Sequence, residues 1–147
     1  LVVVDYAHTP DSILGVLQAM RPLATGRLIV VFGCGGDRDR AKRPLMGRAA
    51  TSTADLTIIT TDNPRSEDPR AIIAEIEPGA SDGGGAFEVE PDRRAAIARA
   101  LAVARPGDAV VIAGKGHERH QEFADRVVDF DDRVIVGEEL RSMGMPR

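Results

Sequence analysis

Apolar and polar residues alternate in blocks along this chain, and the lengths of the blocks indicate the secondary structure. Short, wholly apolar runs stop abruptly at polar or glycine-rich residues, and longer stretches with helical spacing of their apolar positions follow them. Uninterrupted apolar runs are typical of strands that are buried on both faces of a parallel sheet. We therefore predict strands at residues 1–4, 28–32, 56–61 and 109–113, an alternating strand near an edge at 87–90, and a last strand at 127–128 that can run antiparallel.

Capping residues mark where the predicted helices begin. Thr9 and Pro10 have the residue types that are favoured at the N-cap and at the first helical position, and Asp68-Pro69 repeats this pattern. We predict that the second of these helices ends at Pro78-Gly79, before a flexible loop at 81–85. Further helices are predicted from about 43 to 51, from Asp92 to Pro106-Gly107, and from about Asp131 onward. This alternation predicts an α/β fold: a Rossmann-like, doubly wound, mostly parallel sheet with helices on both faces.

Four polar or glycine-rich segments each come directly after an apolar strand. They are residues 5–8, 33–43, 62–65 and 114–118. The carboxyl ends of parallel strands meet at one edge of the sheet, where open α/β sheets bind their ligands. We therefore expect the four segments to line a single cleft.

The segment 62–65, Asp62-Asn63-Pro64-Arg65, is the most informative of the four. It places a carboxylate, an amide and a guanidinium within four residues, at the end of a buried strand. A guanidinium binds a carboxylate through two hydrogen bonds, while Asn and Asp can bind an amine or another donor. This combination predicts a zwitterionic, amino-acid-like ligand.

The glycine-rich segment 33–36 has several interpretations. A nicotinamide dinucleotide fingerprint would need a third glycine at position 38, where Arg38 stands. The segment can instead bind an anion, with backbone N–H groups exposed by the glycines and charge from Arg38, Lys42 and Arg43. A solvated loop with local Asp–Arg pairs is the alternative and accounts for Asp39, Arg40 and Arg48. We separate Arg38 from it because Arg38 follows the glycine turn most closely.

Residues 114–118, Gly-Lys-Gly-His-Glu, are not a phosphate-binding loop, because the pattern G-x-x-x-x-G-K-[ST] does not occur in the chain. Gly114 permits a tight turn that points Glu118 at an ammonium group, and a simple turn with exposed charges is the alternative. His117 and His120 have no distant partner with suitable spacing, so we predict no metal site. Asp5, Tyr6 and His8 can contact a ribose or a base, or only cap the next helix.

The composition narrows the classes of function. The net charge of −4 argues against a nucleic-acid partner, and no apolar run approaches the roughly 20 residues of a membrane span. Cys34 is the only cysteine, which excludes an internal disulfide and is typical of a reducing cytoplasm. We expect a single cytoplasmic domain over residues 1–147. Because it starts on a strand and without methionine, we expect a fragment cut at a domain boundary.

Four separated motifs together resemble one family. They are V-D-Y-A-H-T-P-D at 4–11, G-C-G-G-D-R-D-R-A-K-R-P-L-M-G at 33–47, D-N-P-R-S-E at 62–67 and G-K-G-H-E at 114–118. In this order and spacing, the chain resembles the C-terminal domain of the Mur ligases, specifically of the UDP-N-acetylmuramoyl-tripeptide synthetase (MurE) type. Ala41 departs from the family pattern, where a glycine is expected.

The resemblance implies an ATP- and Mg²⁺-dependent ligase of cytoplasmic peptidoglycan-precursor synthesis. Such an enzyme joins meso-diaminopimelate to UDP-N-acetylmuramoyl-L-alanyl-D-glutamate through an acyl phosphate. The phosphate loop and the magnesium ligands of the family belong to a central ATPase domain, and the uridine nucleotide binds an N-terminal domain. Both domains are absent from this sequence, so the resemblance implies no catalytic residue here and an inactive isolated fragment.

The resemblance also implies roles for individual residues. Arg38, Asn63 and Arg65, with Asp62 and Pro64 of the same tetrapeptide, would hold the distal amino-acid end of diaminopimelate, and Gly114 and Glu118 would complete that pocket. Asp5, Tyr6 and His8 would lie over the ATP nucleoside. The alternatives are a lysine-adding Mur ligase, a folylpolyglutamate-type synthetase and a free-standing amino-acid-binding module. Arg65 discriminates against lysine, which has no distal carboxylate.

Overall fold

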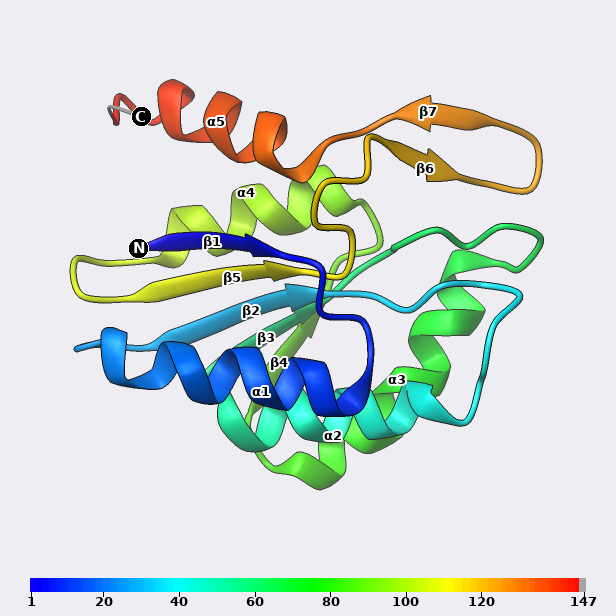
Figure 1. The fold of residues 1–147 in the computed structure, drawn as a ribbon, viewed down its shortest axis with the longest axis horizontal. Helices are drawn as coiled ribbons and strands as arrows, with labels where there is room; N and C mark the ends of the chain where they lie inside the picture. Colours follow the sequence, from blue (N-terminus) through cyan, green and yellow to red (C-terminus); the bar gives the residue numbers. More distant parts are fainter. Residues whose placement is uncertain (146–147) are drawn as a thin grey trace.

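The computed structural model describes residues 1–145 and contains a five-stranded sheet in which every neighbouring pair is parallel. The strand order is β1-β5-β2-β3-β4 (Figure 1). The strands are β1 (Val2–Asp5), β2 (Leu28–Phe32), β3 (Leu56–Ile59), β4 (Ala86–Val89) and β5 (Ala109–Ala113). The predicted doubly wound α/β fold is confirmed, with the alternating strand β4 at an edge and β3 two residues shorter than predicted.

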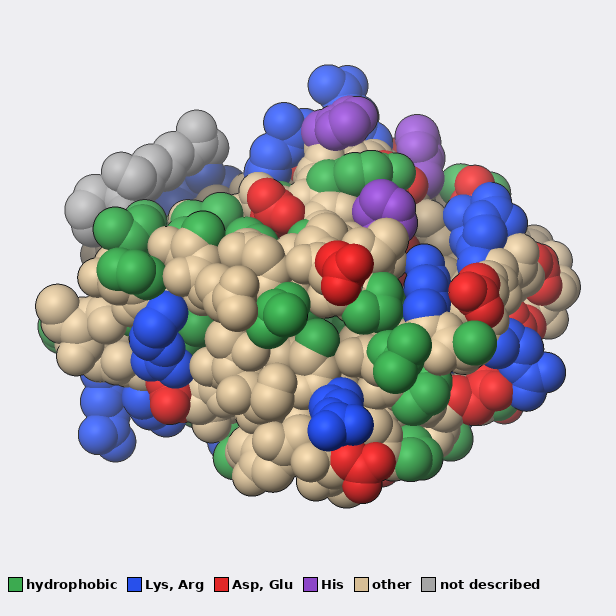
Figure 2. Space-filling model, turned by 60° about the horizontal axis from the view of Figure 1, so that its bottom comes forward, with side chains coloured by type: hydrophobic (Ala, Val, Ile, Leu, Met, Phe, Trp, Pro, Cys, Tyr) green, Lys and Arg blue, Asp and Glu red, His purple; other side chains and the backbone are tan. Residues whose placement is uncertain are grey.

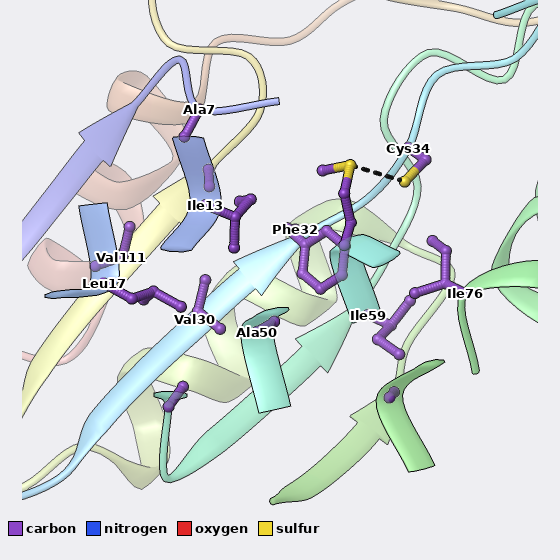
Figure 3. Packing of buried hydrophobic residues seen from close by; sticks show 14 of the residues in the cluster. Ala7, Ile13, Leu17, Val30, Phe32, Cys34, Ala50, Ile59, Ile76 and Val111 are labelled. Atoms are coloured by element: carbon purple, nitrogen blue, oxygen red, sulfur yellow. Dashed lines mark hydrogen bonds between the residues drawn. The ribbon is translucent and has the colours of Figure 1, made fainter. Parts of the chain in front are cut away.

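Helices cover both faces of the sheet (Figure 1). On one face lie α1 (Pro10–Met20), α2 (Lys42–Thr53) and α3 (Pro69–Gly83), and on the other α4 (Arg93–Val103) and α5 (Asp132–Ser142). A short 3₁₀ helix, η1 (Arg21–Leu23), follows α1. Figure 3 shows the first face: Leu17 of α1, Ala50 of α2 and Ile76 of α3 pack toward Val30, Phe32 and Ile59 of the sheet. None of the described helices has the length and hydropathy that a membrane span requires.

The helices begin where their capping residues predict. The side chains of Thr9, Asp68, Asp92 and Asp131 each accept a hydrogen bond from a backbone N–H in the first turn of α1, α3, α4 and α5, respectively. These bonds satisfy N–H groups that have no partner within the helix. Each cap also fixes the residue at which the preceding loop ends and the helix begins.

The predicted end of α3 at Pro78-Gly79 is wrong. The helix continues to Gly83, so residues 81–83 are helical and only Gly84 and Gly85 remain of the predicted loop. A Cβ atom on Gly79 would lie 1.7 Å from the carbonyl oxygen of Pro44 in α2, which shows how closely the two helices pack there. This packing against α2 compensates for the backbone hydrogen bond that a proline cannot donate.

A second, two-stranded sheet lies apart from the main one (Figure 1). The predicted last strand is confirmed as β7 (Val127–Asp129), and it pairs antiparallel with β6 (His120–Glu122), which was not predicted. The sequence His-Gln-Glu of β6 contains no apolar residue, so the apolar pattern gave no signal for this strand. Its central residue, Gln121, is nevertheless buried.

Candidate functional site

The four polar segments after β1, β2, β3 and β5 meet at the carboxyl edge of the sheet and line one cavity of about 310 Å³. The lining includes eight of the ten predicted site residues: Tyr6, His8, Arg38, Asp62, Asn63, Arg65, Gly114 and Glu118. Asp5 and Pro64 are not among the lining residues. We call this cavity the cleft.

Backbone contacts join the glycine-rich segment to the tetrapeptide. The N–H of Gly36 donates to the carbonyl oxygen of Asn63 at 2.8 Å, and Nη1 of Arg65 donates to the carbonyl oxygen of Gly36 at 2.9 Å. A Cβ atom on Gly36 would lie 1.8 Å from the carbonyl oxygen of the buried Pro64, so only glycine fits there. The two segments therefore hold Arg38 and Arg65 on the same side of the cleft.

The backbone of Arg65 adopts a left-handed conformation, with φ of +52°. The β6 strand stabilises it, because the N–H of Arg65 donates to the carbonyl oxygen of Glu122 at 2.9 Å. The guanidinium also contacts this residue, with 3.3 Å between Nε and Oε2 of Glu122. Within residues 1–145, Nη2 of Arg65 makes no hydrogen bond, and the side chain is 23% exposed. Two of the guanidinium nitrogens, Nη1 and Nε, are thus held by the protein, while Nη2 can donate to an anion.

Negative groups also line the cleft. Asp62 and Glu118 belong to different loops, and both contribute to the lining. A Cβ atom on Gly114 would lie 2.6 Å from Oδ2 of Asp62, and Gly114 has φ of +112°, so glycine is needed there for space and for conformation. Together with Arg38 and Arg65, these carboxylates give the cleft both charges, as recognition of a zwitterion requires.

Arg43 and Lys42, which the sequence interpretation grouped with Arg38 as anion-binding charges, bind other parts of the protein. The fully buried Arg43 forms ion pairs with Glu67 and Glu75 and donates to the carbonyl oxygen of Gly35 at 3.1 Å. Lys42 lines the cleft but donates to the carbonyl oxygen of His8 at 3.0 Å. The interpretation is therefore corrected for Arg43, whose charge is compensated by two carboxylates inside the protein.

Glu67, which follows the segment 62–65, connects the buried Arg43 to the glycine-rich loop. Its carboxylate accepts from Arg43 and from the N–H of Asp37, which lies in the glycine-rich loop. The side chain of Asp37 in turn accepts from Ser66, next to Glu67. These contacts anchor Asp37, the residue directly before Arg38 on the loop.

Replacing Glu67 by glutamine is expected to lower the free energy of unfolding near neutral pH. The difference in stability between the two proteins is expected to shrink as the pH falls. The Arg43 guanidinium and the Asp37 N–H lower the pKa of Glu67 from 4.5 to about 2. A carboxyl group with a lowered pKa binds fewer protons in the folded than in the unfolded state. Its contribution to stability is therefore complete above about pH 4.5 and is lost as the pH falls through about 2. Urea unfolding of both proteins between pH 7 and pH 2 measures this. A stability difference that is independent of pH would contradict it.

Aromatic rings stand beside the cleft. The ring of the exposed Tyr6 lies 4.6 Å from that of His8 and 6.0 Å from that of His117, and histidine side chains lie near one another on the surface in Figure 2. The carboxylate of Asp5 accepts from the N–H of Ala7 at 2.8 Å and so shapes the turn that presents Tyr6. Within the described part of the chain, no three His, Cys, Asp or Glu residues are placed to hold a metal ion.

Three residues that the sequence analysis did not identify donate hydrogen bonds to residues of the site. Lys115 is fully buried and donates to Oδ1 of Asn63 at 3.1 Å, and the N–H of Glu122 donates to the same atom at 3.1 Å. Gln121 donates to the carbonyl oxygen of Asp62 at 2.9 Å. The signal that could have identified Lys115 is its place between two glycines directly after a buried strand.

A larger hollow, of about 480 Å³, lies between the first turns of α3 and α4 and the β6–β7 hairpin. Its innermost charged residue, Arg93, is fully buried and is bound to Asp132, with 2.7 Å between Nη2 and Oδ2. Arg94 on its rim is paired with Glu138 and Glu139. Arg93 and Arg94, two of the arginines that line this hollow, are thus paired with carboxylates of the protein.

Fold and cleft together define an α/β domain that presents both signs of charge to a small ligand at the carboxyl edge of a parallel sheet. A family model described as "Mur ligase, glutamate ligase domain" matches residues 1–116. The chain belongs to the Mur ligase family.

Relatives of known name are similar over nearly the whole chain. The UDP-N-acetylmuramoyl-L-alanyl-D-glutamate–2,6-diaminopimelate ligase of Syntrophomonas wolfei is 57% identical over 141 residues, which are 95% of this chain and 29% of that protein. The ligase of the same name from Solibacter usitatus is 53% identical over 98% of this chain and 29% of its own length. A solved structure with this name superimposes with a TM-score of 0.92 at 46% identity, covering 99% of this chain and 30% of that one. This chain thus spans less than a third of these relatives.

Proposed function

We propose that residues 1–147 form the C-terminal, amino-acid-binding domain of a ligase that adds meso-diaminopimelate to UDP-N-acetylmuramoyl-L-alanyl-D-glutamate. The observation that carries this proposal is the presence of two guanidinium groups, Arg38 and Arg65, and two carboxylates, Asp62 and Glu118, in the lining of one cleft of about 310 Å³. The names of the similar ligases support the choice of substrates.

The distal end of diaminopimelate carries an ammonium and a carboxylate on one carbon, and the cleft offers a partner for each. Nη2 of Arg65 and the exposed guanidinium of Arg38 bind the carboxylate, while Asp62 and Glu118 bind the ammonium. With this end held, the other amino group of the ligand points out of the cleft, where it meets the activated dipeptide. Lysine lacks the distal carboxylate and would leave Arg65 without its partner.

ATP, Mg²⁺ and the UDP-linked dipeptide bind mainly outside this domain in our proposal. The 147 residues contain no phosphate-binding loop of the G-x-x-x-x-G-K-[ST] type. We assign the uridine nucleotide to an N-terminal domain and the triphosphate to a central ATPase domain of the longer protein. The exposed rings of Tyr6 and His8, on the turn shaped by Asp5, would contact the nucleoside. Synthesis of peptidoglycan precursors would place the enzyme in the cytoplasm, with no nucleic-acid partner.

A ligation assay tests the proposal. The full-length protein is incubated with ATP, Mg²⁺, UDP-N-acetylmuramoyl-L-alanyl-D-glutamate and either meso-diaminopimelate or L-lysine, and mass spectrometry measures the product. We expect the diaminopimelate product, and a value of kcat/KM for lysine that is lower by about two orders of magnitude. The 147-residue chain alone is expected to give no product. Equal use of lysine would overturn the substrate assignment, and turnover by the chain alone would overturn the domain assignment.

A further inference from the structure

We infer that the buried Lys115 is a positioning residue, which fixes the side-chain amide of Asn63 so that its NH₂ group faces the cleft. The inference deepens the proposed function and rests on it for the identity of the ligand. It assigns a task to a lysine that no ligand can reach, and it predicts which charge of the ligand Asn63 contacts.

The turn after β5 aims Lys115 into the protein. Gly114 and Gly116 on either side of it both have positive φ, +112° and +55°. The lysine side chain is fully buried, and Nζ donates to the carbonyl oxygen of His120 at 2.5 Å and to Oδ1 of Asn63 at 3.1 Å. One ammonium group thereby links the turn after β5, the start of β6 and the tetrapeptide.

The hydrogen bonds of Asn63 determine which way its amide points. Oδ1 receives two donors, Nζ of Lys115 at 3.1 Å and the N–H of Glu122 at 3.1 Å. Neither group can accept a hydrogen bond from an amide NH₂, because an ammonium and a backbone N–H are donors only. Turning the amide over would replace two hydrogen bonds by two contacts between donors. Nδ2 is therefore left for the cleft, which Asn63 lines.

This orientation makes Asn63 a donor toward the ligand. A donor binds a carboxylate, so Asn63 acts on the same ligand group as Arg65, two residues away, and not on the ammonium. The acceptors in the cleft are then Asp62 and Glu118, which leaves the ammonium to them. Lys115 itself does not touch the ligand, since its side chain is fully buried, and its effect on binding passes through Asn63.

Burying the charge of Lys115 costs free energy, and a specific role for this residue explains why it is buried. Burial lowers the pKa of its ammonium group, while the nearby negative charges of Asp62, Glu118 and Asp132 oppose this effect and the positive charge of Arg93 adds to it. A buried ammonium group is costly unless it donates hydrogen bonds, and here it donates to two acceptors on different segments.

Kinetics of the full-length ligase test the inference through a double-mutant cycle of Lys115→Met and Asn63→Ala. For Lys115→Met we expect the KM for meso-diaminopimelate to rise about tenfold, with kcat nearly unchanged, because only ligand positioning is lost. Asn63→Ala should raise the KM by at least as much. The double variant should be no worse than Asn63→Ala, because Lys115 acts through Asn63. If the two effects multiply instead, Lys115 acts independently of Asn63 and the inference is wrong.

A second variant keeps the test valid even if Lys115→Met folds poorly. Asn63→Asp preserves the shape of the side chain and the acceptor for Lys115, but it turns an oxygen toward the cleft in place of NH₂. We expect the KM for meso-diaminopimelate to rise about a hundredfold, whereas an unchanged or lower KM would show that Asn63 faces the ammonium. If the wild type uses another amino acid, the proposed function fails. The cycle is then run on that amino acid, so the two failures are distinguishable.

Discussion

Replacing Arg65 by alanine in the full-length ligase is expected to lower kcat/KM for meso-diaminopimelate by about two orders of magnitude. Removal of one partner from a desolvated ion pair costs about 3–5 kcal/mol, and each 1.4 kcal/mol corresponds to about a factor of ten. The Arg65 side chain is 23% exposed, so water replaces part of what is lost and the lower end of this range applies. Activity with L-lysine, which has no distal carboxylate, should change much less.

The geometry of Arg65 makes this substitution informative. Arginine and alanine carry a similar backbone strain at φ of +52°, so the variant reports on the guanidinium and not on the turn. Glu122, which loses its contact with Nε, is half exposed and can be solvated. Arg48→Ala is the matched control, because Arg48 is exposed and forms no ion pair within the described residues.

The ratio of kcat/KM for the two amino acids, in the wild type and in both variants, is the quantity to measure. An equal fall for diaminopimelate and lysine in Arg65→Ala would mean that Arg65 supports the fold or the end of the ligand that both amino acids share. The selectivity role would then be wrong. Arg48→Ala should leave both values close to those of the wild type.

The sequence predicted those parts of the fold that local chemistry decides. Strands β2 and β5 are unbroken apolar runs, and the first turns of α1 and α3 carry a capping side chain followed by proline. The end of α3 could not be predicted in this way, because close packing of Gly79 on Pro44 of α2 allows the helix to pass Pro78. The β6 strand was missed because its buried residue, Gln121, is polar and is held by its hydrogen bond to the carbonyl oxygen of Asp62.

For the site, topology made the main prediction possible. Any loop that follows a parallel strand reaches the same edge, so the segments around Arg38, Asn63 and Glu118 could be placed together from the sequence. Partners distant in sequence could not be identified. Arg43 looks like a free cation until Glu67 and Glu75 are placed beside it, and a lysine such as Lys115 is expected at the surface. The groups that orient the site are therefore the ones that required the structure.

The ion pair of Arg93 and Asp132 is one such distant contact, and it fixes the cleft to the rest of the molecule. Both side chains are fully buried, with 2.8 Å from Nε to Oδ1 and 2.7 Å from Nη2 to Oδ2. Arg93 also donates to the carbonyl oxygens of Thr61 and Ala113, the residues directly before Asp62 and Gly114. A single guanidinium thus joins α4 and α5 to the two strand ends that carry half of the cleft.

We expect Asp132→Ala to lower the free energy of unfolding by about 3–5 kcal/mol, because it leaves the charge of Arg93 buried without its carboxylate. Urea unfolding of the chain measures the loss. The matched control is Glu138→Ala, which removes an exposed ion pair between the same two helices, Arg94–Glu138, and should cost about 0–1 kcal/mol. Replacing both buried partners, by Arg93→Met with Asp132→Leu, should recover most of the stability, because no uncompensated charge then remains inside. If Asp132→Ala costs no more than Glu138→Ala, water reaches the Arg93 guanidinium, and this ion pair does not hold the two strand ends in place.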